Sequence, residues 1–331
     1  MVAMPDLPPF VQAVAADIYQ VQLPLPFALR IVNCYLLRGH NGWTIVDTGL
    51  NTSQGRETWE TALAALRIAP GDIAQIVLTH VHPDHYGLAG WLQEKTAVPV
   101  RLSPRELQSA QEVWQSDGAW QPAVAHYYVQ CGMPEEVATA VITETNRTRA
   151  RTAPHPTQMT TIEPGSEVLL GNRCCRTLLM PGHSDGQLVF YDAADKLLLC
   201  GDHILQKITP NISLWPLAEA NPLGRYLQSL QELVQLDVRL LLPGHGPLMT
   251  DLQQRIAELE AHHTARLDVM ETAVQAPANV YDISRRVFDF NRLSVHEKRF
   301  AVAETLAHLD YLAQAGRIKQ TVANEQWLFF K

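Results

Sequence analysis

Six of the 13 histidines in this chain of 331 residues follow short aliphatic runs, and this placement constrains the fold more than any other feature. The aliphatic runs are typical of buried strands, and three of them lead directly into a glycine turn. Side chains that follow strand ends meet at one edge of a sheet, where the rigid strands hold them in place. We therefore predict one polar site at that edge. The histidines concerned are His80, His82, His85, His183, His203 and His245.

The densest of these stretches is the run His80-Val81-His82-Pro83-Asp84-His85. Alternate residues of an extended segment share one face, so His80 and His82 can bind one cation together. Asp84 and His85 come where the chain turns toward a helix, so they can face a second cation beside the first. Taken singly, each histidine could equally be a solvated turn residue or a hydrogen-bonding residue of the core. Their repeated position at strand ends favours a metal site.

Three residues that follow later strands can complete the ligand set. His183 can complete the first site, His245 can complete the second, and Asp202 can bridge the two. Imidazoles combined with carboxylates suit zinc, and manganese and iron accept the same ligands. We predict two divalent metal ions, with zinc expected and manganese or iron as alternatives.

Alternating strand and helix patterns predict an α/β (α+β) fold in which helices cover a sheet. Strands are expected at residues 17–23, 30–38, 43–47, 73–79, 98–102, 168–170, 173–180, 188–192, 196–200 and 237–242. Helices are expected at 53–66, 86–95 and 222–235. Residues 103–160 are rich in Gln, Ala and Glu and lack strand patterns, which predicts a helical insertion.

The end of the chain changes to a helical pattern. Helices are expected at 251–274, 280–287 and 295–315, followed by a terminal hairpin that ends at residue 330. Three helices and a hairpin are typical of a winged helix. We predict a catalytic domain over residues 1–250 and a winged-helix-like domain over residues 251–331.

The ordered ligand set resembles that of the metallo-β-lactamase superfamily in spacing and in context. The matching residues are His80, His82, Asp84, His85, His183, Asp202 and His245. Asp47, in the run Val46-Asp47-Thr48-Gly49, is similar to the aspartate of the family's first motif, which supports a metal ligand from behind. The resemblance spans residues 18–247. It implies an αββα sandwich with a two-metal hydrolase site.

Residues 262–331 resemble the small winged-helix domain of the β-lactamase-like protein 2 group, most closely in the stretch from Ala303 to Leu312 and at Gly316-Arg317-Ile318. Members of the superfamily hydrolyse β-lactams, glutathione thioesters, acyl-homoserine lactones and RNA. The resemblance therefore implies a hydrolase without fixing its substrate.

Three further residues are weaker candidates for the site. His203 follows Asp202 directly and can support the site or contact substrate, although a structural role fits it equally well. Tyr86 can stand near the site or cap a helix. Trp215, in the loop at residues 208–216, can form a wall for substrate or simply pack on the core.

The expected reaction is hydrolysis of a small ester, thioester or lactone, with Asp84 orienting the attacking water and passing a proton to the leaving group. The alternative is a nuclease of the β-lactamase-like protein 2 type, and a third hypothesis is a winged-helix regulator whose metal domain senses a ligand. The net charge of −8 disfavours nucleic acid as the partner. The expected partner is the small-molecule substrate of the hydrolase. The oligomeric state is not predicted from the sequence.

Apolar runs approaching the ~20 residues needed to cross a bilayer are absent from the sequence. Residues 1–10 lack a basic-then-apolar signal peptide. The five cysteines are odd in number and scattered, which is typical of reduced thiols rather than a disulfide framework. These features predict a cytoplasmic protein with no membrane partner.

Overall fold

A computed structural model describes residues 7–116 and 118–331, so the signal-peptide prediction for residues 1–10 lies partly outside the described residues. A seven-stranded sheet has the order β1-β2-β3-β4-β5-β6-β7, antiparallel as far as β4 and parallel from β4 onward. Its strands are β1 (Val11–Ala15), β2 (Ile18–Pro24), β3 (Ile31–Gly39), β4 (Gly42–Val46), β5 (Ile73–Val77), β6 (Val100–Leu102) and β7 (Met159–Thr161).

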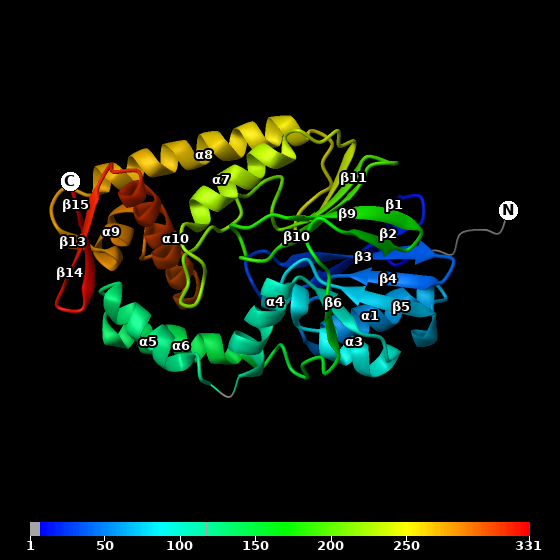
Figure 1. The fold of residues 1–331 in the computed structure, drawn as a ribbon. Coiled ribbons are helices and arrows are strands. Elements are labelled where there is room, and N and C mark those ends of the chain that lie inside the picture. Colours follow the sequence, from blue (N-terminus) through cyan, green and yellow to red (C-terminus); the bar gives the residue numbers. More distant parts are fainter. Residues whose placement is uncertain (1–6, 117) are drawn as a thin grey trace.

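A second, five-stranded sheet stacks on the first, as Figure 1 shows, and has the order β12-β11-β10-β9-β8. The β11–β12 pair is parallel and the others are antiparallel. Its strands are β8 (Glu167–Leu170), β9 (Arg173–Leu179), β10 (Leu188–Asp192), β11 (Leu197–Gly201) and β12 (Leu240–Pro243).

Strand alternation distributes the apolar residues among three core layers. Leu36 points to the layer under the helices α1 (Ser53–Ala65) and α3 (Ala89–Thr96), whereas its neighbour Leu37 points between the sheets. In the second sheet Leu199 points between the sheets. Its neighbour Leu198 points toward α7 (Pro222–Leu233) and α8 (Leu252–Ala273). The predicted αββα sandwich is therefore confirmed.

The helix expected at residues 86–95 is interrupted, and this correction concerns the site directly. A short helix, α2 (Pro83–Tyr86), precedes α3, and the break falls at Gly87 and Leu88. A Cβ at Gly87 would lie 2.8 Å from the Asn51 nitrogen, so the backbones approach closely there. The Leu88 N–H donates to the Gly49 carbonyl at 2.9 Å instead of continuing α2. Such contacts between distant segments leave no local pattern in the sequence.

The insertion is helical as predicted, except at its end. It contains α4 (Pro104–Ser109), a π-helical turn η2 (Ala110–Gln115), α5 (Gln121–Gln130) and α6 (Glu135–Arg149). The prediction was wrong for Met159–Thr161, which form β7 and pair in parallel with β6. It also missed β1, which pairs with β2. Both are edge strands whose state is decided by a neighbouring strand rather than by their own short sequences.

The C-terminal region consists of helices followed by a hairpin, close to the predicted bounds. Its elements are α8, β13 (Ala278–Asn279), α9 (Val280–Val287), α10 (Val295–Gln314), β14 (Lys319–Ala323) and β15 (Gln326–Phe330). Helix α10 packs against α6, α8 and α9, as can be followed in Figure 1. Val141 of the insertion and Leu306 of α10 belong to one continuous apolar core. The boundary at residue 250 stays a prediction.

The cysteines agree with the prediction of reduced thiols. All five are free thiols, and the adjacent Cys174 and Cys175 of β9 are exposed and buried, respectively. Within residues 7–116 and 118–331, none of the helices has both the length and the apolar character to cross a membrane.

A buried histidine pair between α8 and α10 makes stability depend on pH. His263 Nδ1 lies 3.3 Å from His308 Nε2, and both rings are buried. Burial and then the mutual repulsion of the charged forms lower the pKa of His263 to about 3. Burial is also the main cause that lowers the pKa of His308 to about 4. Below pH ~6.5 these histidines bind protons in the unfolded chain but stay neutral in the folded protein. Acid therefore favours unfolding.

Between pH 7 and pH 5 the metal-free protein is expected to lose about 2 kcal/mol of unfolding free energy per histidine of this pair. Urea unfolding at the two pH values measures the loss. The double variant His263→Gln with His308→Gln should lose correspondingly less, whereas His40→Gln, at an exposed position, should behave as wild type. An equal pH dependence in wild type and the double variant would contradict the assignment.

Candidate metal centre

Seven side chains predicted as metal ligands come together at one edge of the sandwich. His80 and His82 follow β5, and Asp84 and His85 stand in the first turn of α2, which begins after His82. The others follow strands of the second sheet: His183 follows β9, Asp202 follows β11 and His245 follows β12. Strands that end at the same edge thus supply ligands from both sheets.

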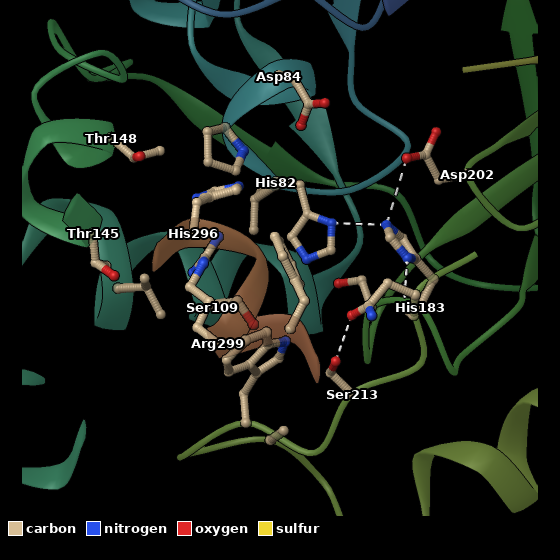
Figure 2. Close-up of a pocket in the computed structure, with 18 of the residues that line it drawn as sticks. His82, Asp84, Ser109, Thr145, Thr148, His183, Asp202, Ser213, His296 and Arg299 are labelled. Carbon is tan, nitrogen blue, oxygen red and sulfur yellow. Dashed lines mark hydrogen bonds and ion pairs between the residues drawn. The ribbon is translucent and has the colours of Figure 1, made fainter. Parts of the chain in front are cut away.

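The first group of donors centres on three imidazoles. His82 Nδ1 lies 2.8 Å from His183 Nε2 and 3.1 Å from His80 Nε2. Figure 2 shows His82 and His183 facing each other, with Asp202 beyond His183. Three imidazole nitrogens this close to one another, with no anion between them, are typical of a site in which they bind one cation through their lone pairs.

The second group combines imidazoles with carboxylates. His245 Nε2 lies 3.3 Å from Asp84 Oδ2 and 3.3 Å from Asp202 Oδ2. His85 Nε2 lies 3.3 Å from Asp202 Oδ1, and His183 Nε2 lies 3.6 Å from Asp202 Oδ2. Asp202 therefore reaches both groups of donors, as expected of a bridging ligand.

Buried polar atoms without partners test whether this set fits metal ions. His85 Nε2, His245 Nε2 and Asp202 Oδ1 are sealed from solvent and make no hydrogen bond within the described part of the chain. Buried polar atoms normally have hydrogen-bond partners, so three buried atoms without one indicate a binding site for a ligand. The donors form overlapping groups whose ligand atoms lie within 4.8 Å of one another, namely His80, His82 and His183; His80, His85 and Asp202; and Asp84, His85 and His245. The residues fit metal binding.

Electrostatics divides the histidines of the site into two kinds. Burial and the nearby His183 lower the pKa of His82 to about 3, and burial also lowers the pKa of His80 and of His183. These rings are neutral at pH 7 and offer lone pairs. Burial lowers the pKa of His245 too, but Asp202 and Asp84 outweigh this effect and raise that pKa to about 10. A metal ion would therefore displace a proton there.

Asp47 stands where the resemblance implied, behind a ligand. Its Oδ2 lies 2.8 Å from His85 Nδ1, and its Oδ1 accepts the Thr79 N–H at 2.8 Å. The bond to Nδ1 leaves His85 Nε2 turned toward Asp202, which fixes the ring for metal binding. Asp47 adopts a φ of 59°, a left-handed conformation that aspartate tolerates better than most residues.

Sequence reasoning missed the residues that hold the His245 loop. Asn33 Nδ2 donates to the carbonyls of Pro243 and Gly246 at 3.0 and 2.9 Å. Tyr35 Oη donates to the same Pro243 carbonyl at 2.7 Å. Both come from β3, in the opposite sheet, so only the packing of the two sheets reveals their role.

Glu106 of α4 was also missed, and it joins two ligand loops. Its Oε2 accepts the Val81 N–H at 2.8 Å, and its Oε1 accepts the Gly186 N–H at 2.9 Å and the Ser184 hydroxyl. The carboxylate is fully buried, and burial raises its pKa against the effect of these hydrogen bonds. The run Ser103-Pro104-Arg105-Glu106 looks like an ordinary helix start, and Ser103 does cap α4. The sequence pattern therefore indicates a helix start and gives no sign that Glu106 also joins two ligand loops.

Replacing Glu106 by glutamine is expected to weaken metal binding and turnover by about 10- to 100-fold, because the new amide group would face an N–H donor and displace a ligand loop. Bound metal after dialysis against a weak chelator, measured with kcat/KM, tests this. Glu136→Gln, at an exposed position in α6, is the control. Wild-type metal retention in Glu106→Gln would show that the ligand loops keep their positions without Glu106.

Two weaker candidates lie away from the ligand cluster. The buried His203 ring turns toward α7, where its Nε2 lies 3.0 Å from Ser229 Oγ. Tyr86 is buried in the core under the first sheet, and its hydroxyl accepts a hydrogen bond from Gln115 Nε2 at 3.2 Å. The structure thus places both in packing environments.

A cavity of about 820 Å³ opens beside the cluster, and Trp215 lies in its wall. His82, Asp84, His183 and Asp202 form one side, as Figure 2 shows. Most of the remaining lining comes from the turn at 26–29, the loop at 208–217, the insertion and the start of α10. Its aromatic residues are Phe27, Trp114, Trp120, Tyr128, Trp215 and Phe300. The cluster is therefore accessible to a small molecule from a largely apolar chamber.

An αββα sandwich with imidazoles and carboxylates gathered at its strand ends defines a metallo-hydrolase. The sequence agrees, since residues 28–245 match the metallo-beta-lactamase superfamily and residues 267–331 match the metallo-beta-lactamase-like C-terminal domain. The chain belongs to the metallo-beta-lactamase superfamily.

Individual relatives resemble from about three quarters to nearly all of this chain. A crystal structure of a metallo-beta-lactamase family protein from Thermus thermophilus is similar with a TM-score of 0.87 and 34% identity, covering 96% of this chain and 100% of that one. The probable metallo-hydrolase YqjP of Bacillus subtilis is 28% identical over 310 residues, 89% of this chain and 92% of the relative. The beta-lactamase-like protein 2 homolog of Caenorhabditis elegans is 23% identical over 248 residues, 73% of this chain and 65% of the relative. The predicted resemblances are confirmed.

Proposed function

We propose that this protein is a dinuclear metal-dependent hydrolase of a small ester, thioester or lactone. One observation carries the proposal: four residues of the donor cluster, His82, Asp84, His183 and Asp202, form one side of a chamber of about 820 Å³ that is also lined by aromatic side chains. Such a chamber suits a compact, partly apolar substrate better than a polymer.

The ligand set divides naturally between two ions. His80, His82 and His183 would hold one, Asp84, His85 and His245 would hold the other, and Asp202 would serve both. Nitrogen and oxygen donors without cysteine suit zinc first, with manganese or iron as alternatives. When bound, such ions lower the pKa of water to near neutrality and polarise a carbonyl oxygen.

Asp84 is the residue to which we assign proton transfer. Its side chain is 15% exposed, whereas that of Asp202, which lines the same cavity, is 7% exposed. A carboxylate in this position can orient the attacking water and then pass its proton to the leaving alkoxide or thiolate. Asp47 and Glu106 would act indirectly, by holding His85 and the ligand loops.

The similarity to the beta-lactamase-like protein 2 homolog keeps a nuclease as the alternative function. A nuclease would need a continuous basic path to the metal centre. The arginines of the C-terminal region do not form one continuous surface. Arg286 Nη1 donates to the Ala273 carbonyl, Arg292 is 88% exposed, and Arg299 lines the cavity. The start of α10 thus supports a role of the proposed winged helix in forming the substrate chamber.

The free state of all five cysteines supports a reducing, cytoplasmic setting as part of the proposal.

Metal analysis of the purified protein combined with a substrate panel tests the proposed function. We expect about two equivalents of metal and turnover of at least one member among S-acyl glutathiones, aryl esters and lactones, lost on chelation and restored by zinc or manganese. RNA is included at 50 mM salt. Metal-dependent cleavage of RNA, with salt-sensitive binding and no turnover of the small substrates, would overturn the proposal in favour of the nuclease.

A further inference from the structure

We infer that Arg299 binds a carboxylate of the substrate, so that the natural substrate is an acyl ester or thioester carrying a free carboxylate at a distance from the scissile carbonyl. This inference rests on the proposed hydrolase function and names its substrate class. It follows from an arginine that faces the chamber without any anion to hold.

Arg299 lacks partners although it is partly buried. Its side chain makes no ion pair and no hydrogen bond with any residue in 7–116 or 118–331, and its Nε is sealed from solvent. A guanidinium has five N–H donors, and a buried one is normally paired. Burial, the largest influence, lowers the pKa of Arg299 below its ordinary value, although Tyr128, Asp84 and Glu144 act to raise it.

The acids around the chamber are engaged elsewhere. Glu112 lies 3.7 Å from Arg105, Glu144 lies 3.1 Å from Arg147, and Glu297 accepts from Ser294 at the start of α10. Asp84 belongs to the ligand cluster and would be neutralised by a bound cation. Asp84 and Glu144 act on Arg299 from a distance, but neither forms an ion pair with it, so its N–H groups are available to a bound anion.

Aromatic rings fix the direction in which Arg299 can bind. Its guanidinium carbon lies 4.3 Å from the Phe300 ring centre and 5.3 Å from that of Trp215. Rings that cover the face of a guanidinium leave its edge, with the N–H groups, free for a planar partner. A carboxylate matches this edge with two parallel hydrogen bonds.

Other groups near Arg299 do not compete for this role. His296 lies beside it, and burial and Arg299 itself lower the pKa of His296 to about 4, so the ring is neutral at pH 7. Arg105 is paired with Asp185 at 2.8 Å. Arg151 also lines the chamber without an ion pair in the described chain, but none of its nitrogens is sealed from solvent.

The position of Arg299 relative to the cluster sets the shape of the substrate. In Figure 2, Arg299 and His296 extend from α10 between His82 on one side and Thr145 and Thr148 of α6 on the other. Arg299 lines the same cavity as four of the proposed ligands, namely His82, Asp84, His183 and Asp202. A substrate with its carboxylate on Arg299 would pass an apolar body along the aromatic wall and present its carbonyl to the cluster.

Matched thioesters test the inference in the metal-loaded full chain. The probes are N-acetylcysteamine monothioesters of glutaric, adipic and suberic acid, each compared with the same thioester ending in a carboxamide. Wild type should prefer the best carboxylate by about 10- to 100-fold in kcat/KM, the size expected of hydrogen bonds to a charged group. In Arg299→Met the ratio of kcat/KM for carboxylate to that for carboxamide should fall to about one, and Arg299→Lys should keep part of the preference.

Arg292→Met, at an exposed position just before α10, is the control and should retain the wild-type preference. Equal rates on carboxylates and carboxamides in wild type, or an unchanged preference in Arg299→Met, would overturn the inference while leaving the hydrolase intact. If Arg299→Met loses its native circular dichroism, Arg299→Lys and Arg299→Gln decide the matter by the same ratio.

A binding measurement separates this inference from the proposed function. Suberamic acid, with one carboxylate, is titrated calorimetrically into wild type and Arg299→Met, with suberamide as the blank. Tighter binding of suberamic acid by wild type, reduced about tenfold or more in the variant, supports the site even if no thioester is cleaved, in which case only the hydrolase proposal fails. Equal affinity in the two proteins contradicts the site.

Discussion

Replacing Asp202 by alanine is expected to reduce turnover by about a thousandfold or more and to leave the protein with less than its full metal content. The reason is geometric, because Asp202 is the carboxylate that reaches both donor groups, at 3.3 Å from His85 and His245 and 3.6 Å from His183. Without it, Asp84 is the one carboxylate left in the ligand set, and a single negative charge would face two cations.

Asp84→Ala should cause a comparable loss of kcat, because Asp84 is proposed both as a metal ligand and as the group that transfers the proton. Metal content and kcat measured together on both variants distinguish ligand loss from loss of proton transfer. Asp237→Ala, whose side chain is 72% exposed, removes only a surface ion pair and should stay at wild-type activity. Near-normal turnover in Asp84→Ala or Asp202→Ala would refute the proposed centre.

The second large effect is expected from Gly244→Ala, although glycine contributes no ligand. A Cβ at Gly244 would overlap Asp202 Oδ1 and lie 2.7 Å from His85 Cε1, far inside contact distance. Either the bridging carboxylate or the His245 loop must move. We expect bound metal to fall and kcat/KM to drop by about 100-fold or more, since displacement of a reacting centre by about 1 Å costs that much.

Gly246→Ala supplies the matched control from the same loop. Gly246 has a φ of 76°, but a Cβ there would meet nothing within 4 Å. Backbone strain of about 1 kcal/mol should lower stability without removing metal. If both variants lose metal equally, loop strain rather than the clash with Asp202 explains the result. Metal content and thermal unfolding of the two proteins decide this.

Local sequence signals were sufficient where an element is determined by its own residues. The bounds 280–287 of α9 and 188–192 of β10 agree with the prediction, because apolar periodicity and flanking turn residues are local. The ligand set was readable for a similar reason, since each ligand follows a strong strand signal closely in the chain.

Contacts between distant segments account for what was missed. The strand β7 depends on pairing with β6, and the helix break at Gly87 depends on the approach of Gly49 and Asn51. Glu106 carries a helix-start signal that reveals nothing of its bonds to Val81 and Gly186. A sequence pattern records a residue's neighbours along the chain and not the groups that fold against it.

The amino-acid sequence by itself indicated strands covered by helices, a helical insertion and the seven side chains able to bind metal, because strand patterns and ligand spacing are properties of short segments. The sandwich itself followed from the family resemblance that those side chains carry. Only the tertiary structure decided what surrounds those ligands. It brought the insertion and the start of α10 over the strand ends, where they form the chamber and turn Arg299 into it. These walls come from segments far apart in the chain, and their meeting depends on the packing of whole elements.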